Sequence, residues 1–405
     1  MHYSRFALWR LLTIVFVSPI LLNVLLPGGI VLAVRQVPRT CNWTTQPTPP
    51  FPVGNGLGSV YAESATNVWA VGSLSHSPAP YAITLAEHFD GTSWTQLATP
   101  NPGLDANDFT AVASVNATIA WAVGIRLDVI GSNLSTLIEK YNGTSWKYIA
   151  SPNVANGSNV LEAIDVVSQS NIWTVGYVTL LIGQSDVEQT LILHWDGKSW
   201  QIVPSPNLGA GNNILYGIAS SSAKNIWAVG QYAASDGNPQ TLTEHYDGTA
   251  WNIEPSPSPG TMPINYLYSV AHVPGTKTFY AVGTNRSLGT NTRTLIEEYD
   301  GTAWSVVPSA NQNTSDNLLK AVAVVNATDV YAVGYYYNYN DIAQTMIEQW
   351  DGTAWNIVST PDIGTRDNYL DSVTALDAKN VWTVGQYTDK TKSPPDSQAL
   401  VEYFC

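Results

Sequence analysis

The sequence has few charged residues, few basic residues in particular, and only two cysteines. Asp, Glu, Lys and Arg make up 12% of its 405 residues, about half the usual share. The formal net charge is −14, and a surface of this sign repels phosphate backbones, which argues against nucleic-acid binding. Low charge combined with abundant Trp, Tyr and Gly is typical of an exported β-protein rather than a helical cytosolic enzyme.

Sequence motifs for metal and phosphate chemistry are also missing. The chain has no cysteine and histidine spacing of a zinc site and no phosphate-binding glycine loop. His88, His194 and His245 occupy one position in separate copies of a repeat, so they do not converge easily on a metal ion. We therefore expect no metal site and no cofactor.

One six-residue pattern recurs along the chain. Residues Asn67–Gly72 have the sequence Asn-Val-Trp-Ala-Val-Gly, and six related copies follow at intervals of 51 to 54 residues. The copies are centred on Trp121, Trp173, Trp227, Tyr280, Tyr331 and Trp382. A fixed period of this size indicates a stacked or circular repeat architecture. One closed ring of seven units would account for residues 41–405 as a single domain.

Each unit divides into four short predicted strands. The first carries Leu, a variable residue and a small residue, and the second is the Trp-Ala-Val-Gly strand. The third ends at an Asp-Gly or Asn-Gly turn, which is a strong hairpin signal, and the fourth runs from a Trp to prolines, which end a strand. The small residues, which suit strands crowded round an axis, are Ser59, Ala111, Ala163, Gly217, Ser269, Ala321 and Ser372. We predict an all-β fold, a seven-bladed β-propeller of four-stranded antiparallel blades, with a solenoid of seven stacked units as the alternative.

The two cysteines stand at the ends of the repeat region. Residues 401–405 align with a third strand, and Cys405 occupies the place of the Asp in the following turn. Residues 41–43, which begin with Cys41, align with the fourth strand. We therefore predict that the last blade is closed by the N- and C-terminal strands and that a Cys41–Cys405 disulfide replaces the turn, as export permits. Two unpaired thiols are the alternative.

Residues 1–40 are predicted to be a signal peptide or an N-terminal membrane anchor. A basic start precedes an uncharged stretch over residues 11–34, which Pro27-Gly28-Gly29 interrupts. This order fits a secretory signal that is cleaved after Ala33, whereas the full stretch is long enough for an uncleaved anchor. In both cases we expect residues 41–405 to be extracytoplasmic, with membrane contact only through the N-terminal segment.

The segment Tyr299–Trp304, with the sequence Tyr-Asp-Gly-Thr-Ala-Trp, resembles the kelch-type repeat, in which a Tyr-Asp turn precedes a Trp strand. The likeness covers residues 41–405. It departs from the kelch pattern after the second strand, where one glycine such as Gly72 replaces the expected pair. The resemblance implies a binding scaffold. A galactose-oxidase-like branch of that group carries copper chemistry, but no cysteine is left here for its Tyr–Cys cofactor.

Two residue types recur at fixed repeat positions and are expected to be structural. Fourteen of the 15 tryptophans are in repeat register, and their large apolar area suits a core between blades better than a sugar-binding stripe. A glutamate recurs on the third strand of six units, for which a shared structural hydrogen bond is favoured over an acid series. These glutamates are Glu87, Glu139, Glu244, Glu297, Glu348 and Glu402.

The longest predicted loops join the second to the third strand and one unit to the next. In antiparallel blades both sets emerge on the same side, so we expect this face to be the working surface. The variable residue of the first strand begins at this face, and its ring of side chains is expected to line the mouth of a central pocket. A solvated rim without a ligand is the alternative. The ring consists of Gly58, Thr110, Glu162, Tyr216, Tyr268, Lys320 and Asp371.

Together these features favour a β-propeller that binds an extracellular glycan or protein through its long-loop face. Tyr335, Tyr336 and Tyr337 are assigned to a loop that suits sugar or protein contact, although an exposed loop without a ligand fits equally. The ligand-binding candidates are Glu162, Tyr216, Tyr268, Lys320, Asp371, Tyr335, Tyr336 and Tyr337. The alternative is a carbohydrate-active hydrolase or lyase at the mouth of the channel, with Glu162 and Asp371 as paired carboxylates.

Overall fold

The computed structural model describes residues 41–129, 131–389 and 396–405, and Cys41–Cys405 form one compact unit. The predictions of a signal peptide or anchor and of cleavage after Ala33 concern residues that lie outside the described ones. Every regular element in the described part of the chain is a strand. No helix there is long and apolar enough to cross a membrane.

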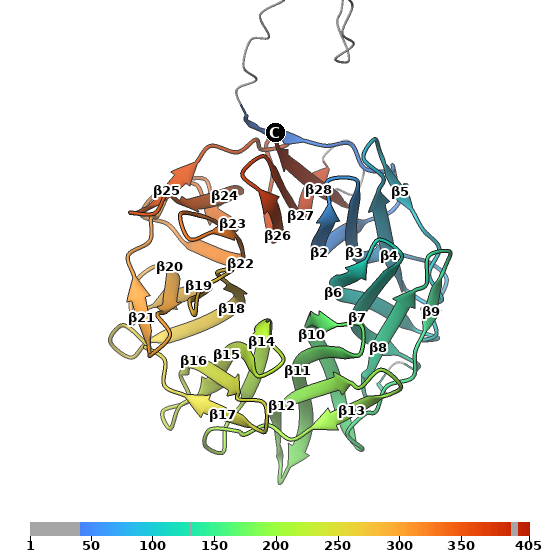
Figure 1. Cartoon of the computed structure of the whole chain (residues 1–405), viewed down its shortest axis with the longest axis horizontal. Coiled ribbons are helices and arrows are strands. Elements are labelled where there is room, and N and C mark those ends of the chain that lie inside the picture. The colour runs from blue at the N-terminus through green and yellow to red at the C-terminus, as the bar shows by residue number, and fades with distance from the viewer. Residues whose placement is uncertain (1–40, 130, 390–395) are drawn as a thin grey trace, which may run out of the picture. The chain divides into compact units, whose positions relative to one another are not determined.

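The strands form antiparallel sheets that stand round a central opening (Figure 1). Among the described residues, five sheets have four strands each and one sheet has eight. The eight-stranded sheet consists of two groups of four that meet at a single parallel pair, Ala82 opposite Ala106. Four-stranded sheets repeated radially about a channel are the layout of a β-propeller.

Strands β2 to β17 fall into four groups of four strands. The first group is β2 (Asn55–Ser64), β3 (Asn67–Ser75), β4 (Ala82–Phe89) and β5 (Trp94–Gln96). The second is β6 (Ala106–Asn116), β7 (Ile119–Leu127), β8 (Ser135–Tyr141) and β9 (Trp146–Tyr148). The third is β10 (Gly157–Ser168), β11 (Asn171–Ile182), β12 (Ser185–Trp195) and β13 (Trp200–Val203). The fourth is β14 (Asn213–Ser222), β15 (Asn225–Ala233), β16 (Pro239–Tyr246) and β17 (Trp251–Glu254).

The remaining strands complete the ring. The fifth group is β18 (Ile264–His272), β19 (Phe279–Arg286), β20 (Arg293–Tyr299) and β21 (Trp304–Val307). The sixth is β22 (Asn317–Asn326), β23 (Asp329–Tyr337), β24 (Ala343–Trp350) and β25 (Trp355–Val358). The last sheet is β26 (Asn368–Asp377), β27 (Asn380–Asp389), β28 (Asp396–Phe404) and β1 (Trp43–Thr45).

The first strand of each group lies nearest the opening and contains a β-bulge (Figure 1). In β2, Leu57 pairs with Gly72 and Ser59 pairs with Val71, so Gly58 is an extra residue without a cross-strand partner. The other six inner strands have the same register shift. The extra residues are Gly58, Thr110, Glu162, Tyr216, Tyr268, Lys320 and Asp371. A bulge changes the direction in which a side chain points. The residues of the variable ring therefore differ from their neighbours in backbone conformation as well as in sequence.

The repeated glycine of the second strand is required by a close approach of two backbones. A Cβ atom built on Gly72 would lie 2.1 Å from the carbonyl oxygen of Gly56. At the six equivalent glycines the same distance is 1.9 to 2.1 Å. No side chain fits at that distance, so glycine is what allows the second strand to pass beside the bulge.

We expect the substitution Gly72→Ala to lower the free energy of unfolding by about 3 kcal/mol, because the added carbon forces the two strands apart. Chemical denaturation of the purified protein measures this loss. Gly58→Ala is the matched control, since its new Cβ would meet no atom closer than 3.7 Å, and a change of no more than about 0.5 kcal/mol is expected there. Equal losses in the two variants would contradict this explanation of the repeat.

Aromatic pairs join each group of strands to the next. The ring of Trp69 on β3 meets Trp146 on β9 edge to face, with centroids 5.4 Å apart. The same contact recurs in six further pairs, with centroids 5.2 to 6.1 Å apart: Trp121–Trp200, Trp173–Trp251, Trp227–Trp304, Tyr280–Trp355, Trp43–Tyr331 and Trp94–Trp382. Since edge-to-face pairs contribute beyond their buried area, these tryptophans are core residues, as predicted.

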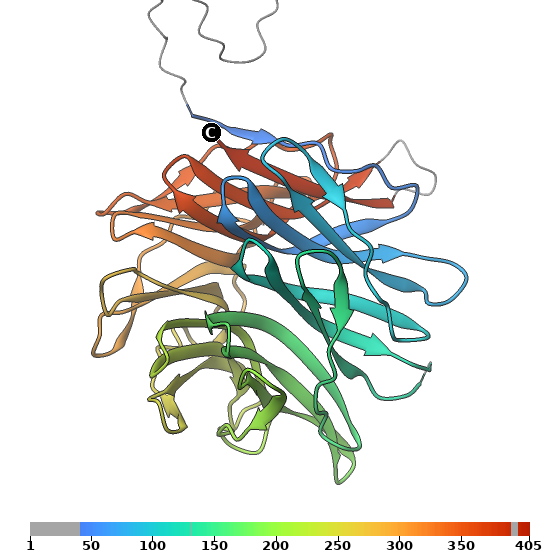
Figure 2. The ribbon, with the colours of Figure 1, turned by 45° about the vertical axis from the view of Figure 1, so that its right-hand side comes forward.

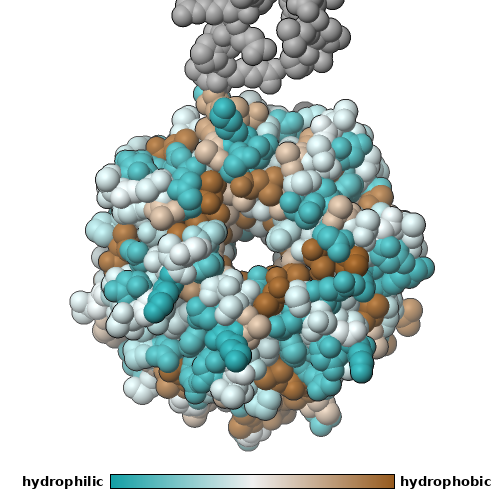
Figure 3. Space-filling model, viewed as in Figure 1, coloured by the Kyte–Doolittle hydropathy of each residue, from teal (hydrophilic) through white to brown (hydrophobic). Residues whose placement is uncertain are grey.

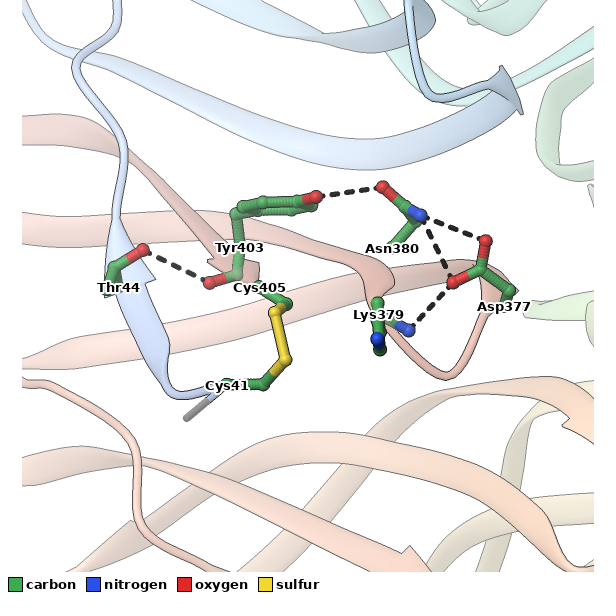
Figure 4. Close-up of a disulfide and its surroundings, with 7 residues drawn as sticks. All are labelled: Cys41, Thr44, Asp377, Lys379, Asn380, Tyr403 and Cys405. Atoms are coloured by element: carbon green, nitrogen blue, oxygen red, sulfur yellow. Dashed lines mark hydrogen bonds between the residues drawn. A yellow bond between two sulfur atoms is a disulfide. The ribbon is translucent and has the colours of Figure 1, made fainter. Parts of the chain in front are cut away.

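The last sheet combines strands from both ends of the described unit. Strand β1 pairs with β28, with Trp43 opposite Phe404, and Figure 2 shows the blue strand beside the red ones. Beyond these strands, Cys41 and Cys405 form a disulfide with Cα atoms 4.6 Å apart (Figure 4). The predicted disulfide is therefore confirmed, and it stands at the place where other groups have an Asp-Gly or Asn-Gly turn.

The six glutamates of the third strands are completely buried. The carboxyls of Glu348 and Glu402 bond to the segment that leaves the preceding group of strands. Glu348 accepts a hydrogen bond of 2.9 Å from the backbone N–H of Ala310, and Glu402 accepts one from the hydroxyl of Thr360. Burial raises the pKa of Glu348 and of Glu402 to about 8. Glu348 and Glu402 therefore each join one group of strands to its neighbour. Both carboxyl oxygens of Glu87, Glu139, Glu244 and Glu297 are instead buried without a hydrogen-bond partner among the described residues, so the predicted shared hydrogen bond forms at only part of the six positions.

Candidate functional site

The side chains of the ring meet at the end of the central channel where the inner strands begin. Figure 3 shows that the middle of the ring stays open when all side chains are drawn. The ring is not uniform. Glycine or threonine occupies it in the first two groups, acidic residues in the third and last, and tyrosine or lysine in the groups between. The mouth therefore has two sides. We call the side with the small and acidic residues the hollow side, and the side with Tyr216, Tyr268 and Lys320 the filled side.

The hollow side is a cavity of about 540 Å³. It exists because Gly56 and Gly58 leave space where the inner strands of other groups carry larger side chains. The lining residues come from seven strands and the segment before β2. They are Gly54, Asn55, Gly56, Leu57, Gly58, Gly72, Ser73, Ser75, Asp108, Phe109, Thr110, Glu162, Asp371, Gln386, Asp396 and Ser397. A concave site with several convergent polar groups is the usual form of a small-ligand pocket.

The structure brings the predicted carboxylates Glu162 and Asp371 into this one cavity. The charge of Lys320 acts on both of them. The Lys320 ammonium lies 4.3 Å from the centre of the Tyr268 ring, within the range of a cation–π contact. The Tyr268 ring in turn lies 5.5 Å from that of Tyr216. These five predicted residues therefore form one continuous surface across the mouth.

The assignment of Tyr335, Tyr336 and Tyr337 to a loop is wrong. All three lie in strand β23, because the second strand continues past its glycine before the chain turns. Successive side chains of a strand point to opposite faces, and the three tyrosines separate accordingly. The Tyr335 ring contacts Tyr337 and Tyr369 at 5.8 and 4.8 Å. Tyr336 instead donates a hydrogen bond of 2.8 Å to Gln344, so it does not belong to the surface at the mouth.

Other predicted loops are also shorter than expected. Strands β11 and β12 run to Ile182 and from Ser185, so a two-residue turn replaces the long loop that was assigned to this connection. The hydrophobic side chains at this tip are exposed, with Leu181 at 70% and Ile182 at 49%. At this connection the face on which the inner strands begin therefore presents strand ends rather than an irregular loop.

Burial shifts the ionisation of the acidic groups at the mouth. It raises the pKa of Glu162 to about 7, with a further rise from Asp108 and an opposing effect of Lys320. It raises the pKa of Asp371 to about 6, again opposed by Lys320. Burial also raises the pKa of Asp108, although a hydrogen bond from Ser73 works against it. Shifted carboxyls often cluster at functional sites, but the buried glutamates of the third strands are shifted as well. The shared cavity, rather than the shift, therefore marks Glu162 and Asp371 as a candidate site.

The basic and phenolic groups are shifted for the same reason. Burial lowers the pKa of Lys320, while Asp371 and Glu162 oppose this change. Burial raises the pKa of Tyr268 to about 12, and it also raises the pKa of Tyr216 and of Tyr335. The tyrosine hydroxyls are therefore neutral at physiological pH and present both a donor and an acceptor.

The described residues offer no metal site. No group of three or more His, Cys, Asp or Glu among them is arranged to hold an ion. His88, one of the three repeated histidines, has its Nε2 2.6 Å from Asn67 Oδ1, and its ring lies 4.4 Å from that of Trp69. The other two make the same contacts in their own sheets: His194 with Asn171 and Trp173, and His245 with Asn225 and Trp227.

Sequence reasoning missed part of this site. The cavity residues Asp108, Gln386 and Asp396 were not singled out. They come together only when different sheets pack side by side, which no local sequence pattern indicates. A signal was present at Gly54–Gly58, where three glycines interrupt a strand that carries larger residues in every other unit. Glycine within a strand often marks a bulge or a place where a ligand approaches closely.

A ring of buried asparagines was missed as well. Asn107 accepts a hydrogen bond from the Gly103 N–H at 2.7 Å and donates one to the Gly103 carbonyl at 2.8 Å. The equivalent asparagines also bond to the segment before their own inner strand. They are Asn55, Asn159, Asn213, Asn265, Asn317 and Asn368. Their regular spacing in the sequence was the available signal, and they fix the backbone round the mouth.

Comparison with known proteins supports the fold and leaves the function open. No family model and no curated protein matches this sequence. The solved structure "YCF48 bound to D1 peptide" superimposes with a TM-score of 0.52 at 13% identity, covering 91% of this chain and 98% of its own. An ulvan lyase of polysaccharide lyase family PL25, bound to -[GlcA(1-4)Rha3S]-, gives a TM-score of 0.54 at 9% identity, with 86% and 94% covered.

A second structure of the ulvan lyase matches equally well, with a TM-score of 0.54 at 10% identity. Likenesses at such low identity concern the fold alone. With the sheet layout described above, they identify this chain as a β-propeller protein. The kelch-type resemblance stays a prediction, since no family model matches.

Proposed function

We propose that this protein is an exported binding scaffold that holds an extracellular glycan at the mouth of its channel. The scaffold is a seven-bladed, kelch-like propeller, in which the eight-stranded sheet counts as two blades and the N- and C-terminal strands close the last one. Export is supported by the Cys41–Cys405 disulfide, because such bonds persist mainly in oxidising compartments. Residues 1–40 supply the export signal or the anchor.

The observation that carries this proposal is the division of the mouth into two kinds of surface. The hollow side offers carboxylate, amide and hydroxyl oxygens, including those of Glu162, Asp371 and Thr110. The filled side offers the rings of Tyr216 and Tyr268. A sugar chain needs both, since its hydroxyls require hydrogen-bonding partners and its apolar ring faces pack on aromatic rings.

We expect Tyr268→Ala to weaken glycan binding by about tenfold or more, because it removes an aromatic anchor at the centre of the site. Binding is measured on an array of extracellular glycans and on cell-envelope extract. Tyr148→Ala on the outer strand β9 is the matched control, and its binding should be unchanged. Equal loss in both variants would contradict the site, and binding of a protein in place of any glycan would contradict the ligand class.

A carbohydrate-active hydrolase or lyase is the second candidate, and one observation favours it. Glu162 and Asp371 line the same cavity, and burial brings the pKa of each near neutrality, as general acid–base catalysis requires. Product release from a panel of polysaccharides would be followed for the protein and for a Glu162→Gln/Asp371→Asn variant. Activity that survives both substitutions would eliminate this candidate.

A further inference from the structure

We propose that the ligand at the mouth carries protonated amino groups, as an oligomer of an amino sugar does. This inference rests on the proposed glycan-binding function and names the chemical class of the glycan. It begins from the charge of the hollow side. Four carboxylates line the cavity, those of Asp108, Glu162, Asp371 and Asp396, and its lining residues include no Lys, Arg or His. A glycan that bears carboxylate or sulfate groups would be repelled there.

Two of these carboxylates lack the hydrogen bonds that the fold gives to its turn aspartates. The turn residue Asp90, for example, accepts hydrogen bonds from the backbone N–H groups of Thr92 and Ser93. No hydrogen bond to Glu162 or Asp371 is present within the described residues. Desolvated acceptors without donors are unfavourable. A ligand with ammonium and hydroxyl groups would donate hydrogen bonds to these two carboxylates.

The spacing of the carboxylates favours an extended organic cation over a metal ion. They come from four different inner and outer strands, β6, β10, β26 and β28, and among the described residues no three acidic groups converge on one point. A single ion therefore cannot satisfy them. A chain that carries an amine on each successive sugar ring can reach several of them at once.

The protein itself shows how an ammonium group is accommodated at this mouth. The Lys320 ammonium rests over the Tyr268 ring at 4.3 Å, and its charge acts on Glu162 and Asp371. An amine of the ligand would use the same partners, an aromatic face and a carboxylate. Lys320 is then a competitor of the ligand, so removing its charge should strengthen binding.

The test compares a β-1,4-linked glucosamine oligomer with the N-acetylated oligomer of the same length, by calorimetric titration over a pH series through neutrality, because Glu162 and Asp371 also titrate there. We expect the amine form to bind at least about tenfold more tightly. Asp371→Asn should reduce that preference about tenfold, and Lys320→Met should increase affinity for the amine form. Asp186→Asn, at an exposed hairpin tip, is the matched control for net charge and should change neither affinity. Unchanged thermal unfolding of each variant establishes that it is folded.

The outcomes separate this inference from the function on which it rests. Equal binding of both oligomers, or tighter binding of the acetylated one, overturns the amine inference and leaves glycan binding intact. Tighter binding of an oligolysine peptide than of either oligomer overturns the glycan class while keeping recognition of amines. Binding of none of these probes overturns the inference, and the envelope and array screen then decides the proposed function independently.

Discussion

Replacing Cys41 and Cys405 by serine is expected to lower the free energy of unfolding by as much as about 6 kcal/mol. The reason is the length of the loop that the disulfide closes, since the two residues are 364 positions apart. Without the bond, the three-residue strand β1 is held in the last sheet by its pairing with β28 and by the packing of Trp43. Denaturation by guanidinium chloride, followed by tryptophan fluorescence, measures the loss.

Reduction of the unsubstituted protein is the control for this prediction. A reducing agent should reproduce the loss of stability in the unsubstituted protein and have no effect on the double serine variant. If the serine variant unfolds at the same denaturant concentration as the oxidised protein, the pairing of β1 with β28 and the packing of Trp43 close the ring without the covalent bond.

Raising the pH from about 5 to about 9 is expected to destabilise the protein strongly through its six buried glutamates. Burial raises the pKa of five of them from the usual 4.5 to about 8, and it raises the pKa of the sixth, Glu244, as well. The folded state therefore binds more protons than the unfolded state between these values. Stability is full below about 4.5 and declines as the pH rises toward 8. Each carboxyl should contribute about 1 kcal/mol or more, as measured by calorimetry across this range.

The chain provides its own control for the pH prediction. Leu193 stands at the glutamate position of the third group of strands, so an uncharged side chain fits there. Glu244→Leu and Glu139→Gln should each flatten the decline of stability with pH. The exposed turn aspartates do not interfere, because backbone hydrogen bonds lower the pKa of residues such as Asp90, and they titrate below this window. An unchanged slope in both variants would show that other groups cause the decline.

Much of the fold followed from the sequence because its main determinants repeat. The Trp-Ala-Val-Gly strand, the Asp-Gly turns and the two terminal cysteines each have a local signature that fixes a strand, a hairpin or a covalent bond. The β-bulge was not predicted. It results from the approach of Gly72 to the Gly56 carbonyl, a contact between two backbones that leaves no pattern beyond the glycine itself.

The candidate site was predictable only in part. Glu162 and Asp371 were noticed because they vary where the surrounding sequence is uniform, and they do line one cavity. The cavity itself arises from the absence of side chains at Gly56 and Gly58, whose consequence depends on residues far away in the chain. Tyr335–Tyr337 were assigned to a loop because the repeated strand pattern ends at its glycine, whereas β-pairing with β24 extends the strand through all three.

Because of the bulges, the side chains at the mouth can vary without affecting the pairing of the strands that carry them. Each of the seven bulged residues lies outside the cross-strand register, and the positions already accommodate glycine, threonine, tyrosine, lysine and both acidic residues. A combinatorial library at these seven codons would therefore vary the side chains at the mouth while leaving strand pairing untouched. The same independence allows natural selection to change the side chains of the mouth one residue at a time on an unchanged backbone.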